Sequence, residues 1–204
     1  VLARAGLGLE GQGAVAGDNG GLAQFGPETF AGLRGHKGNV YEGGLRVPAI
    51  IEWPAQIQPR VSKFPACTMD IFPTISQIVH LDPTERLMPQ DGVSLLDMID
   101  NETLSRSKPI GFHYQKQLAF IDGDWKILTT DAPAGQFELY NLANDPNETQ
   151  NLSESQPEQF QRMQQLLVKW NHSVEASVVG LDYPEKKVSD SEPKSAAWYE
   201  LEQY

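Results

Sequence analysis

Two short polar segments near the start of the chain carry residue types that could do chemistry. In Gly17-Asp18-Asn19-Gly20 a carboxylate and an amide carbonyl stand side by side in a glycine-flanked turn. Both are hard oxygen donors of the kind that suits Ca²⁺ or Mg²⁺ rather than zinc. Asp18 and Asn19 are therefore candidate ligands of a divalent cation. The alternative is an ordinary turn, because Asn and Gly tolerate left-handed backbone angles.

The second segment is a glycine-rich loop, residues 33–48, that carries Arg34, His36 and Lys37. Glycines let the backbone approach a ligand closely, and cations favour an anion there. Hard oxygen donors beside a cationic loop predict a site for a phosphate-like or sulfate-like group. Taken singly, Lys37 is typical of a solvated surface cation. His36 could line the anion pocket, or it could make a structural hydrogen bond within the loop.

Together, the two segments resemble the formylglycine-dependent sulfatases of the alkaline-phosphatase superfamily. In that family an Asp-Asn pair after a central strand supplies two ligands to a divalent cation. A lysine in an Arg-Gly-x-Lys-Gly…Glu-Gly-Gly-x-Arg-x-Pro run contacts the sulfate. By resemblance, Asp18 and Asn19 are the metal ligands and Lys37 is the sulfate contact. The pattern is completed by Glu42, Gly43, Gly44, Arg46 and Pro48.

The resemblance implies a sulfatase, a sulfuric ester hydrolase, that acts on a sulfated glycan or an aryl sulfate. It also implies Ca²⁺ (or Mg²⁺) and a formylglycine nucleophile made from a Cys/Ser-x-Pro-x-Arg motif. This chain lacks that motif, because Thr-Met-Asp follows Cys67, and it lacks the paired aspartates that complete the family's metal shell. We therefore expect the C-terminal half of a sulfatase, inactive alone, whose partner is the N-terminal half of the same protein. The family's members imply a periplasmic, extracellular or lysosomal location.

Other functions remain open at this point. One is a non-catalytic domain that keeps the sulfatase shape and binds a sulfated ligand or a protein partner. The glycine-rich residues 11–17 favour it a little, because the family has a buried apolar strand there and glycine weakens a strand. Another is a phosphoesterase of the same superfamily, although the Lys-Gly…Glu-Gly-Gly run favours sulfate. A further alternative concerns Arg46, which could hold the loop through a salt bridge to Glu42 or to a neighbour.

Composition narrows the possible partners. The chain has 204 residues and a formal net charge of −11, so nucleic acid is an unsuitable partner and any sulfated polyanion must be attracted by local cations. Its one cysteine, Cys67, excludes an internal disulfide and lies outside any metal-ligand spacing. No apolar run approaches the ~20 residues of a membrane helix. The chain opens at Val1 without a secretory signal pattern, which suggests a piece of a longer protein.

The order of predicted elements gives an α/β fold class. Residues 46–53 are a predicted strand that starts near Pro48 and stops at Pro54. Residues 69–80 are a predicted helix, with Asp70 favouring its N-terminus. One helical face would carry Ile71, Ile75, Ile78 and Val79.

Residues 108–140 contain short β-prone segments, with Asp122-Gly123 as a good hairpin turn between two of them. They predict an antiparallel sheet of about four strands. Residues 157–174 are a predicted helix that packs on this sheet, with Leu166 and Trp170 buried. Its apolar face is formed by Phe160, Met163, Leu166, Leu167 and Trp170.

We thus predict three parts. Residues 1–107 are the C-terminal part of the main α/β domain of an alkaline-phosphatase-like sulfatase fold. Residues 108–178 are a small antiparallel sheet packed on a C-terminal helix, and residues 179–204 are an extended tail. In the family such a subdomain walls the substrate cleft, so His113 and Lys116 are candidate substrate contacts. The alternative for His113 is a sheet-edge histidine with a local hydrogen bond.

Overall fold

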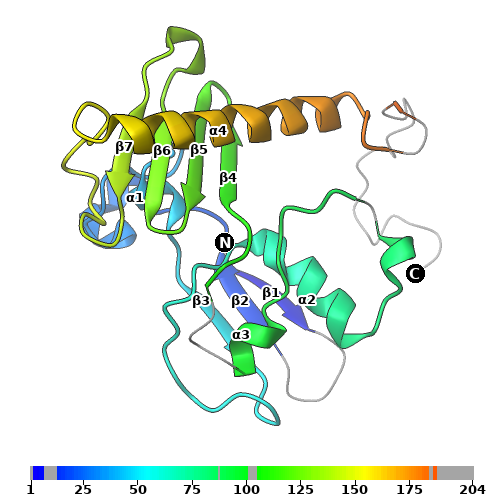
Figure 1. The fold of residues 1–204 in the computed structure, drawn as a ribbon. Helices are drawn as coiled ribbons and strands as arrows, with labels where there is room; N and C mark the ends of the chain where they lie inside the picture. The colour runs from blue at the N-terminus through cyan, green and yellow to red at the C-terminus, as the bar shows by residue number, and fades with distance from the viewer. Residues whose placement is uncertain (1, 7–12, 87, 101–104, 184–185, 188–204) are drawn as a thin grey trace, which may run out of the picture.

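The strands of the protein form two separate antiparallel sheets (Figure 1). The computed structural model describes residues 2–6, 13–86, 88–100, 105–183 and 186–187. The first sheet has the order β1-β2-β3, with β1 at Leu2–Gly6, β2 at Gly13–Gly17 and β3 at Ala49–Glu52. Both sheets lie beside helices, so the predicted α/β class is confirmed.

The glycine-rich segment before Asp18 is the central strand of the first sheet. β2 pairs with β1 on one side and with β3 on the other, and Ala16 lies opposite Ala49. Pairing with two neighbours satisfies the backbone of a strand that has little side-chain surface to pack. Residues 11 and 12, the first two of the glycine-rich stretch, lie outside the described residues.

β3 confirms the predicted strand and leaves its side chains in solvent. It follows Pro48 directly, and all four of its residues are exposed. Ile50 is 67% exposed and Ile51 is 41% exposed. A short helix that the sequence did not predict, α1 (Glu42–Leu45), precedes it.

The second sheet confirms the predicted four strands. β4 (Ile110–Tyr114), β5 (Gln117–Asp122), β6 (Trp125–Thr129) and β7 (Glu138–Asn141) pair in chain order. The hairpin between β5 and β6 is where we predicted it, but Asp122 lies opposite Trp125, so the two turn residues are Gly123 and Asp124, one position later than the predicted Asp122-Gly123. Gly123 has a φ of 60°, the left-handed region in which glycine is favoured.

Both faces of the second sheet are covered, because alternate residues of a strand face opposite sides. The helix α4 (Pro157–Val178) lies across one face, and α1 with its loop lies behind the other (Figure 1). The core on the α4 side contains Leu118, Phe120, Ile127, Leu139, Met163 and Leu167. The core on the α1 side contains Val40, Ala119, Leu128 and Tyr140.

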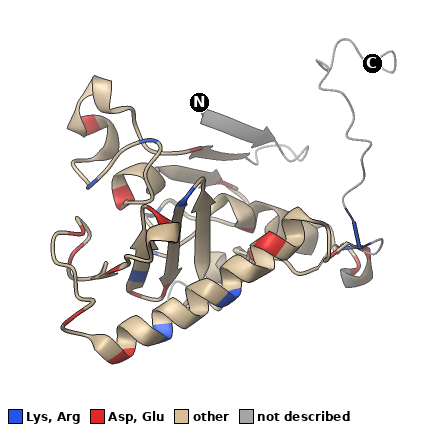
Figure 2. Ribbon diagram, turned by 90° about the horizontal axis from the view of Figure 1, so that it is seen from above, with Lys and Arg blue, Asp and Glu red and all other residues tan. Residues whose placement is uncertain are grey.

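α4 runs four residues beyond the predicted end and buries a different part of its apolar face. Met163 and Leu167 are fully buried. Leu166 and Trp170, which we predicted to be buried, are only partly buried at the margin of this core. Trp170 packs on Gly111 of β4, where any side chain would overlap the indole ring. The outer surface of α4 carries charges of both signs (Figure 2).

The segment between the two sheets contains two helices. The predicted helix 69–80 is observed as a 3-10 turn (Thr68–Asp70) that runs into α2 (Ile71–Ile78), and α3 covers Leu96–Asp100. Pro73 is buried in the first turn of α2, where a missing donor costs little. The remaining 3-10 turns are Ala23–Phe25, Pro27–Phe30, Pro83–Glu85 and Ala132–Ala134.

Within the described residues, no helix has the length and apolar character needed to cross a membrane. The division of the chain at residues 107 and 178 stays a prediction. Most of the predicted extended tail, residues 188–204, lies outside the described residues.

Candidate functional site

The backbone brings the Asp-Asn turn and the cationic loop together. The N–H of Lys37 donates a 2.9 Å hydrogen bond to the carbonyl oxygen of Gly21. The N–H of Gly20 donates a 2.9 Å hydrogen bond to the carbonyl oxygen of Gly44. Gly20 and Gly21 directly follow Asp18 and Asn19, and both bonds join them to the loop of residues 33–48. The candidate metal ligands and the candidate sulfate contact therefore belong to one compact unit.

Asp18 and Asn19 lie directly after β2 and are exposed. The amide Nδ2 of Asn19 donates to Asp18 Oδ2 at 3.2 Å, so the two side chains are adjacent. The pKa of Asp18 is lowered, first by its own backbone N–H and in smaller part by the positive charge of Lys37. Asp18 is therefore a carboxylate at neutral pH.

The glycines of the Glu-Gly-Gly run allow backbone to approach backbone closely, while an approach of the loop to a ligand stays a prediction. A Cβ on Gly20 would overlap the carbonyl of Gly43. A Cβ on Gly44 would lie 2.7 Å from the carbonyl oxygen of His36 and would overlap that of Asn39. The segments around Gly20, around His36 and Asn39, and around Gly43 and Gly44 thus pack too closely to leave room for a Cβ. This explains why glycine occupies positions 20 and 44.

His36 makes the structural hydrogen bonds of a loop residue. Its N–H donates to Asn39 Oδ1 at 3.1 Å, and its ring Nδ1 lies 2.9 Å from the carbonyl oxygen of Lys37. The side chain of Lys37 is exposed. A role for His36 in substrate binding stays a prediction, and the observed contacts give it a role in holding the Lys37 backbone.

The structure does not bring His113 to this loop. His113 pairs with Leu118, whose side chain belongs to the core under α4, so the two share the face opposite α1. Its Nε2 lies 3.1 Å from the carbonyl oxygen of Gln115, the local contact of the alternative interpretation. The same hairpin does reach the loop through Gln117, whose Nε2 donates to the carbonyl of Gly38 at 2.8 Å. A substrate contact by His113 stays a prediction.

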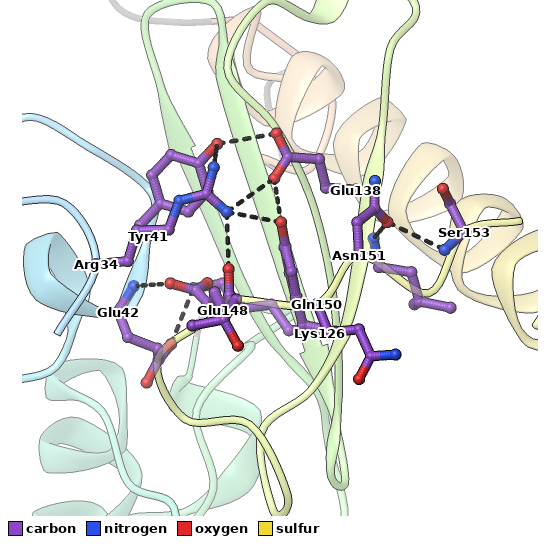
Figure 3. Close-up of polar contacts among 12 residues, drawn as sticks. Arg34, Tyr41, Glu42, Lys126, Glu138, Glu148, Gln150, Asn151 and Ser153 are labelled. Atoms are coloured by element: carbon purple, nitrogen blue, oxygen red, sulfur yellow. Dashed lines mark hydrogen bonds and ion pairs between the residues drawn. The ribbon is translucent and has the colours of Figure 1, made fainter. Parts of the chain in front are cut away.

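Arg34 clamps the loop to the second sheet, a role that the sequence analysis missed. Its Nη1 donates to the hydroxyl of Tyr140 at 2.7 Å and to the carbonyl of Glu148 at 2.8 Å. Its Nη2 donates to the hydroxyl of Tyr41 at 3.0 Å, and that hydroxyl donates to Glu138 Oε1 at 2.9 Å (Figure 3). Burial and the adjacent Glu138 raise the pKa of Tyr41 to about 12, so the phenol remains a donor.

A buried ion network lies beside this clamp. Lys126 Nζ lies 2.9 Å from Glu42 Oε1 and 2.7 Å from Glu148 Oε1. The carboxylate of Glu42 therefore faces Lys126, and the salt bridge to Arg46 that we considered is wrong. The only hint in the sequence was a lysine within the apolar strand Trp125–Thr129.

The donor set around the Asp-Asn turn suits part of a metal shell. In the ranges that the structure describes, no group of three or more His, Cys, Asp and Glu side chains could hold an ion. Asp18 and Asn19 offer hard oxygens, but Ca²⁺ takes about six to eight of them. The two residues fit a hard cation whose remaining ligands come from elsewhere.

Comparison with known proteins decides the family. Residues 35–175 match the model of the C-terminal region of N-sulphoglucosamine sulphohydrolase, and they make up more than half of the chain. The chain belongs to the sulfatase family. It corresponds to the C-terminal portion, as the Asp-Asn turn and the Lys37 loop predicted.

Curated sulfatases match this portion of their own sequences. N-acetylgalactosamine-6-O-sulfatase of Bacteroides thetaiotaomicron is 28% identical over 147 residues, 66% of this chain and 29% of that protein. A sulfatase of Formosa agariphila is 29% identical over 184 residues, 82% of this chain and 32% of that protein. Mouse steryl-sulfatase is 36% identical over 84 residues, 40% of this chain and 13% of that protein. The chain spans about a third of the length of the first two relatives.

Solved structures support the same family assignment. A Bacteroides thetaiotaomicron protein, described with the metabolism of multiple glycosaminoglycans, matches at a TM-score of 0.65 and 26% identity over 76% of this chain and 38% of its own. Ps i-CgsB in complex with k-i-k-neocarrahexaose matches at a TM-score of 0.64 and 26% identity, over 77% of this chain and 35% of its own. The sulfatase fold is therefore shared by this chain and by sulfatases of known structure.

Proposed function

We propose that the complete protein hydrolyses sulfate esters and that this portion supplies part of its active site. Asp18 and Asn19 would hold a divalent cation, Ca²⁺ or Mg²⁺, and Lys37 would contact the sulfate. The observation that carries the proposal is the pair of backbone hydrogen bonds, Lys37 to Gly21 and Gly20 to Gly44, that makes one unit of the two segments.

Sulfate-ester hydrolysis needs a nucleophile, positive charge around the sulfuryl oxygens and a proton for the leaving alcohol. A bound divalent cation supplies charge stabilisation and a template for the reacting groups. Lys37 suits the second requirement, because an exposed ammonium makes a charge-assisted hydrogen bond to an anionic oxygen. The close backbone contacts at Gly20 and Gly44, with the hydrogen bond from Lys37 to Gly21, would hold the Lys37 backbone beside the Asp-Asn turn. Preorganised positive charge of this kind is effective because it need not reorganise during the reaction.

The nucleophile and the remaining metal ligands are expected in the N-terminal half of the same protein, with formylglycine as the nucleophile. The exposed β3 supports this proposal. Its apolar Ile50 and Ile51 are in solvent, although buried aliphatic side chains are the rule for a strand of this composition. We propose that the N-terminal half covers β3 and completes the site.

A sulfated glycan is the favoured substrate class. One relative is an N-acetylgalactosamine-6-O-sulfatase, and one structural neighbour was solved with a neocarrahexaose. The exposed Lys37 loop also suits a substrate that is too large to enter an enclosed pocket. An aryl sulfate serves as the assay substrate, since it reports the same bond cleavage.

The test uses the complete enzyme and measures metal content beside turnover. Asp18→Ala should lose bound metal and activity together. Lys37→Ala should keep its metal and lose activity by about 100-fold or more, the cost of removing one group that stabilises transition-state charge. Matched controls are Asp131→Ala and Lys169→Ala, exposed residues of the second sheet's loop and of α4.

Three results separate the possibilities. If Asp18→Ala keeps the metal content and the activity of the wild type, the pair is only a turn and the metal-ligand assignment is wrong. Faster hydrolysis of an aryl phosphate than of the matching aryl sulfate would assign a phosphoesterase. Turnover of an aryl sulfate by residues 1–204 alone, retained through purification, would contradict the prediction that this portion is inactive without the N-terminal half.

A further inference from the structure

Three charged side chains from distant parts of the chain meet under the Lys37 loop. Glu42 belongs to α1, Lys126 is the second residue of β6, and Glu148 lies in the loop after β7. Lys126 and Glu148 are fully buried and Glu42 is 6% exposed. Besides its ion pair with Lys126, Glu148 accepts the backbone N–H of Glu42 at 2.7 Å through Oε2 (Figure 3).

A buried ion network contributes less to the stability of a fold than its close contacts suggest. Taking three charges out of water carries a desolvation cost that apolar side chains of similar size would avoid. One ammonium also faces two carboxylates, so the cluster is not neutral. Glu148 adds a backbone cost, because its φ of 55° is in the left-handed region that non-glycine residues avoid. Strained and buried polar residues are concentrated where function constrains the geometry.

The network is joined to the Lys37 loop by a short chain of bonds. Glu42 opens α1, and Gly43 beside it donates its N–H to the carbonyl of Arg34 at 2.7 Å. Gly44 accepts the N–H of Gly20, which leads to the Asp-Asn turn. Glu42 therefore links the second sheet to both candidate segments, in addition to the contacts of Arg34 with Tyr140 and of Gln117 with Gly38.

We propose that Lys126 is a positioning residue for the active site, a proposal that rests on the proposed function. Its buried ion pairs with Glu42 and Glu148 lock α1 onto β6 and thereby set the place of Lys37 relative to Asp18. The second sheet then acts as the platform of the sulfate site. Lys126 acts on the reaction through the loop, since its side chain is fully buried.

The test is a double-mutant cycle in the complete enzyme, with Lys126→Met and Lys37→Ala made singly and together. Met fills the space of the lysine stem without the charge. Lys126→Met should lower kcat/KM by about 100-fold, as expected when a reacting group is displaced by about 1 Å. In the Lys37→Ala background the same change should cost less than about threefold, because residues that act as a unit are not additive. Lys169→Met on the exposed side of α4 is the matched control.

Equal losses in both backgrounds would show a general structural role and overturn the proposal, as would unchanged kcat/KM in Lys126→Met. If Lys37→Ala itself leaves kcat/KM unchanged, the proposed function fails instead, and the cycle distinguishes the two failures. Lys126→Met leaves two carboxylates buried without a cation, so the triple variant Lys126→Met/Glu42→Gln/Glu148→Gln is tested beside it. A folded triple variant with wild-type kcat/KM would also overturn the proposal; a folded one with the 100-fold loss would support it.

Discussion

Arg106 binds the side chain of Asp70, which lies 36 residues earlier in the chain, through two hydrogen bonds. Its Nη1 donates to Oδ2 at 2.7 Å and its Nη2 donates to Oδ1 at 2.9 Å. Asp70 is fully buried and also accepts the backbone N–H groups of Cys67 and Val93, each at 2.8 Å. One carboxylate thus ties the start of α2 to the segment before α3 and to the segment before β4. The sequence suggested only a favourable charge at a helix N-terminus.

Asp70→Ala should destabilise the protein by about 3–5 kcal/mol, the cost of leaving the other member of a buried ion pair without its partner. The side chain of Arg106 is only 6% exposed, so water cannot replace the lost carboxylate. The free energy of unfolding in urea measures this effect. Asp131→Ala, an exposed aspartate with no capping bond, should change it by less than about 0.5 kcal/mol. Similar values for the two variants would contradict the assigned role.

Asp70 should also contribute to acid unfolding. Burial of the carboxyl raises its pKa, but hydrogen bonds from Arg106, Val93 and Cys67 outweigh burial and leave the pKa below its ordinary value. A carboxyl with a lowered folded pKa contributes stability above the unfolded pKa of about 3.9 and loses it as the pH falls through the folded value. Between about pH 5 and pH 2, the stability of Asp70→Asn should therefore fall less steeply than that of the wild type. Unfolding curves at several pH values test this, and parallel slopes would contradict it.

Leu167 should matter more for stability than its neighbour Leu166. Leu167 is fully buried against the second sheet, so Leu167→Ala should cost about 2–5 kcal/mol. Leu166 lies at the margin of the same core, and Leu166→Ala should cost roughly 1 kcal/mol, a typical value for a point variant. Denaturant unfolding of the two variants gives the comparison directly. The reverse order would mean that α4 is rotated relative to the sheet.

Gly44→Ala should disturb the candidate site in the complete enzyme. The added Cβ would overlap the carbonyls of Asn39 and His36, and the loop must shift to relieve it. We expect a loss of kcat/KM of about 100-fold, because displacement of Lys37 by about 1 Å suffices for that. Gly135→Ala is the control: its φ of 69° carries a backbone cost of roughly 1–2 kcal/mol, but the space around it is open. Stability loss without activity loss is expected there, and equal activity in both variants would contradict the prediction.

Local signals in the sequence were sufficient for the elements of the second sheet and for the two candidate segments. The hairpin at Asp122-Gly123 and the helix from Pro157 were predictable because turn chemistry and helical periodicity act between near neighbours. The Asp18-Asn19 pair and the loop around Lys37 were found because their unusual residues occur in one register. None of these inferences required knowing which distant residues come together.

Tertiary structure decided the rest. It placed Lys126 under Glu42 and Glu148, and Arg34 on Tyr41 and Tyr140. Glu42 lies 84 residues from Lys126, and Tyr140 lies 106 residues from Arg34. Glu148 and Tyr41 are nearer to their partners in the sequence, but they belong to other elements of the fold. A charge in an apolar strand has no meaning until its partner is known, because burial makes it costly alone and stabilising only when it is paired. The face of His113 was likewise set by strand register, since a shift of one residue would move its side chain to the other side of the sheet.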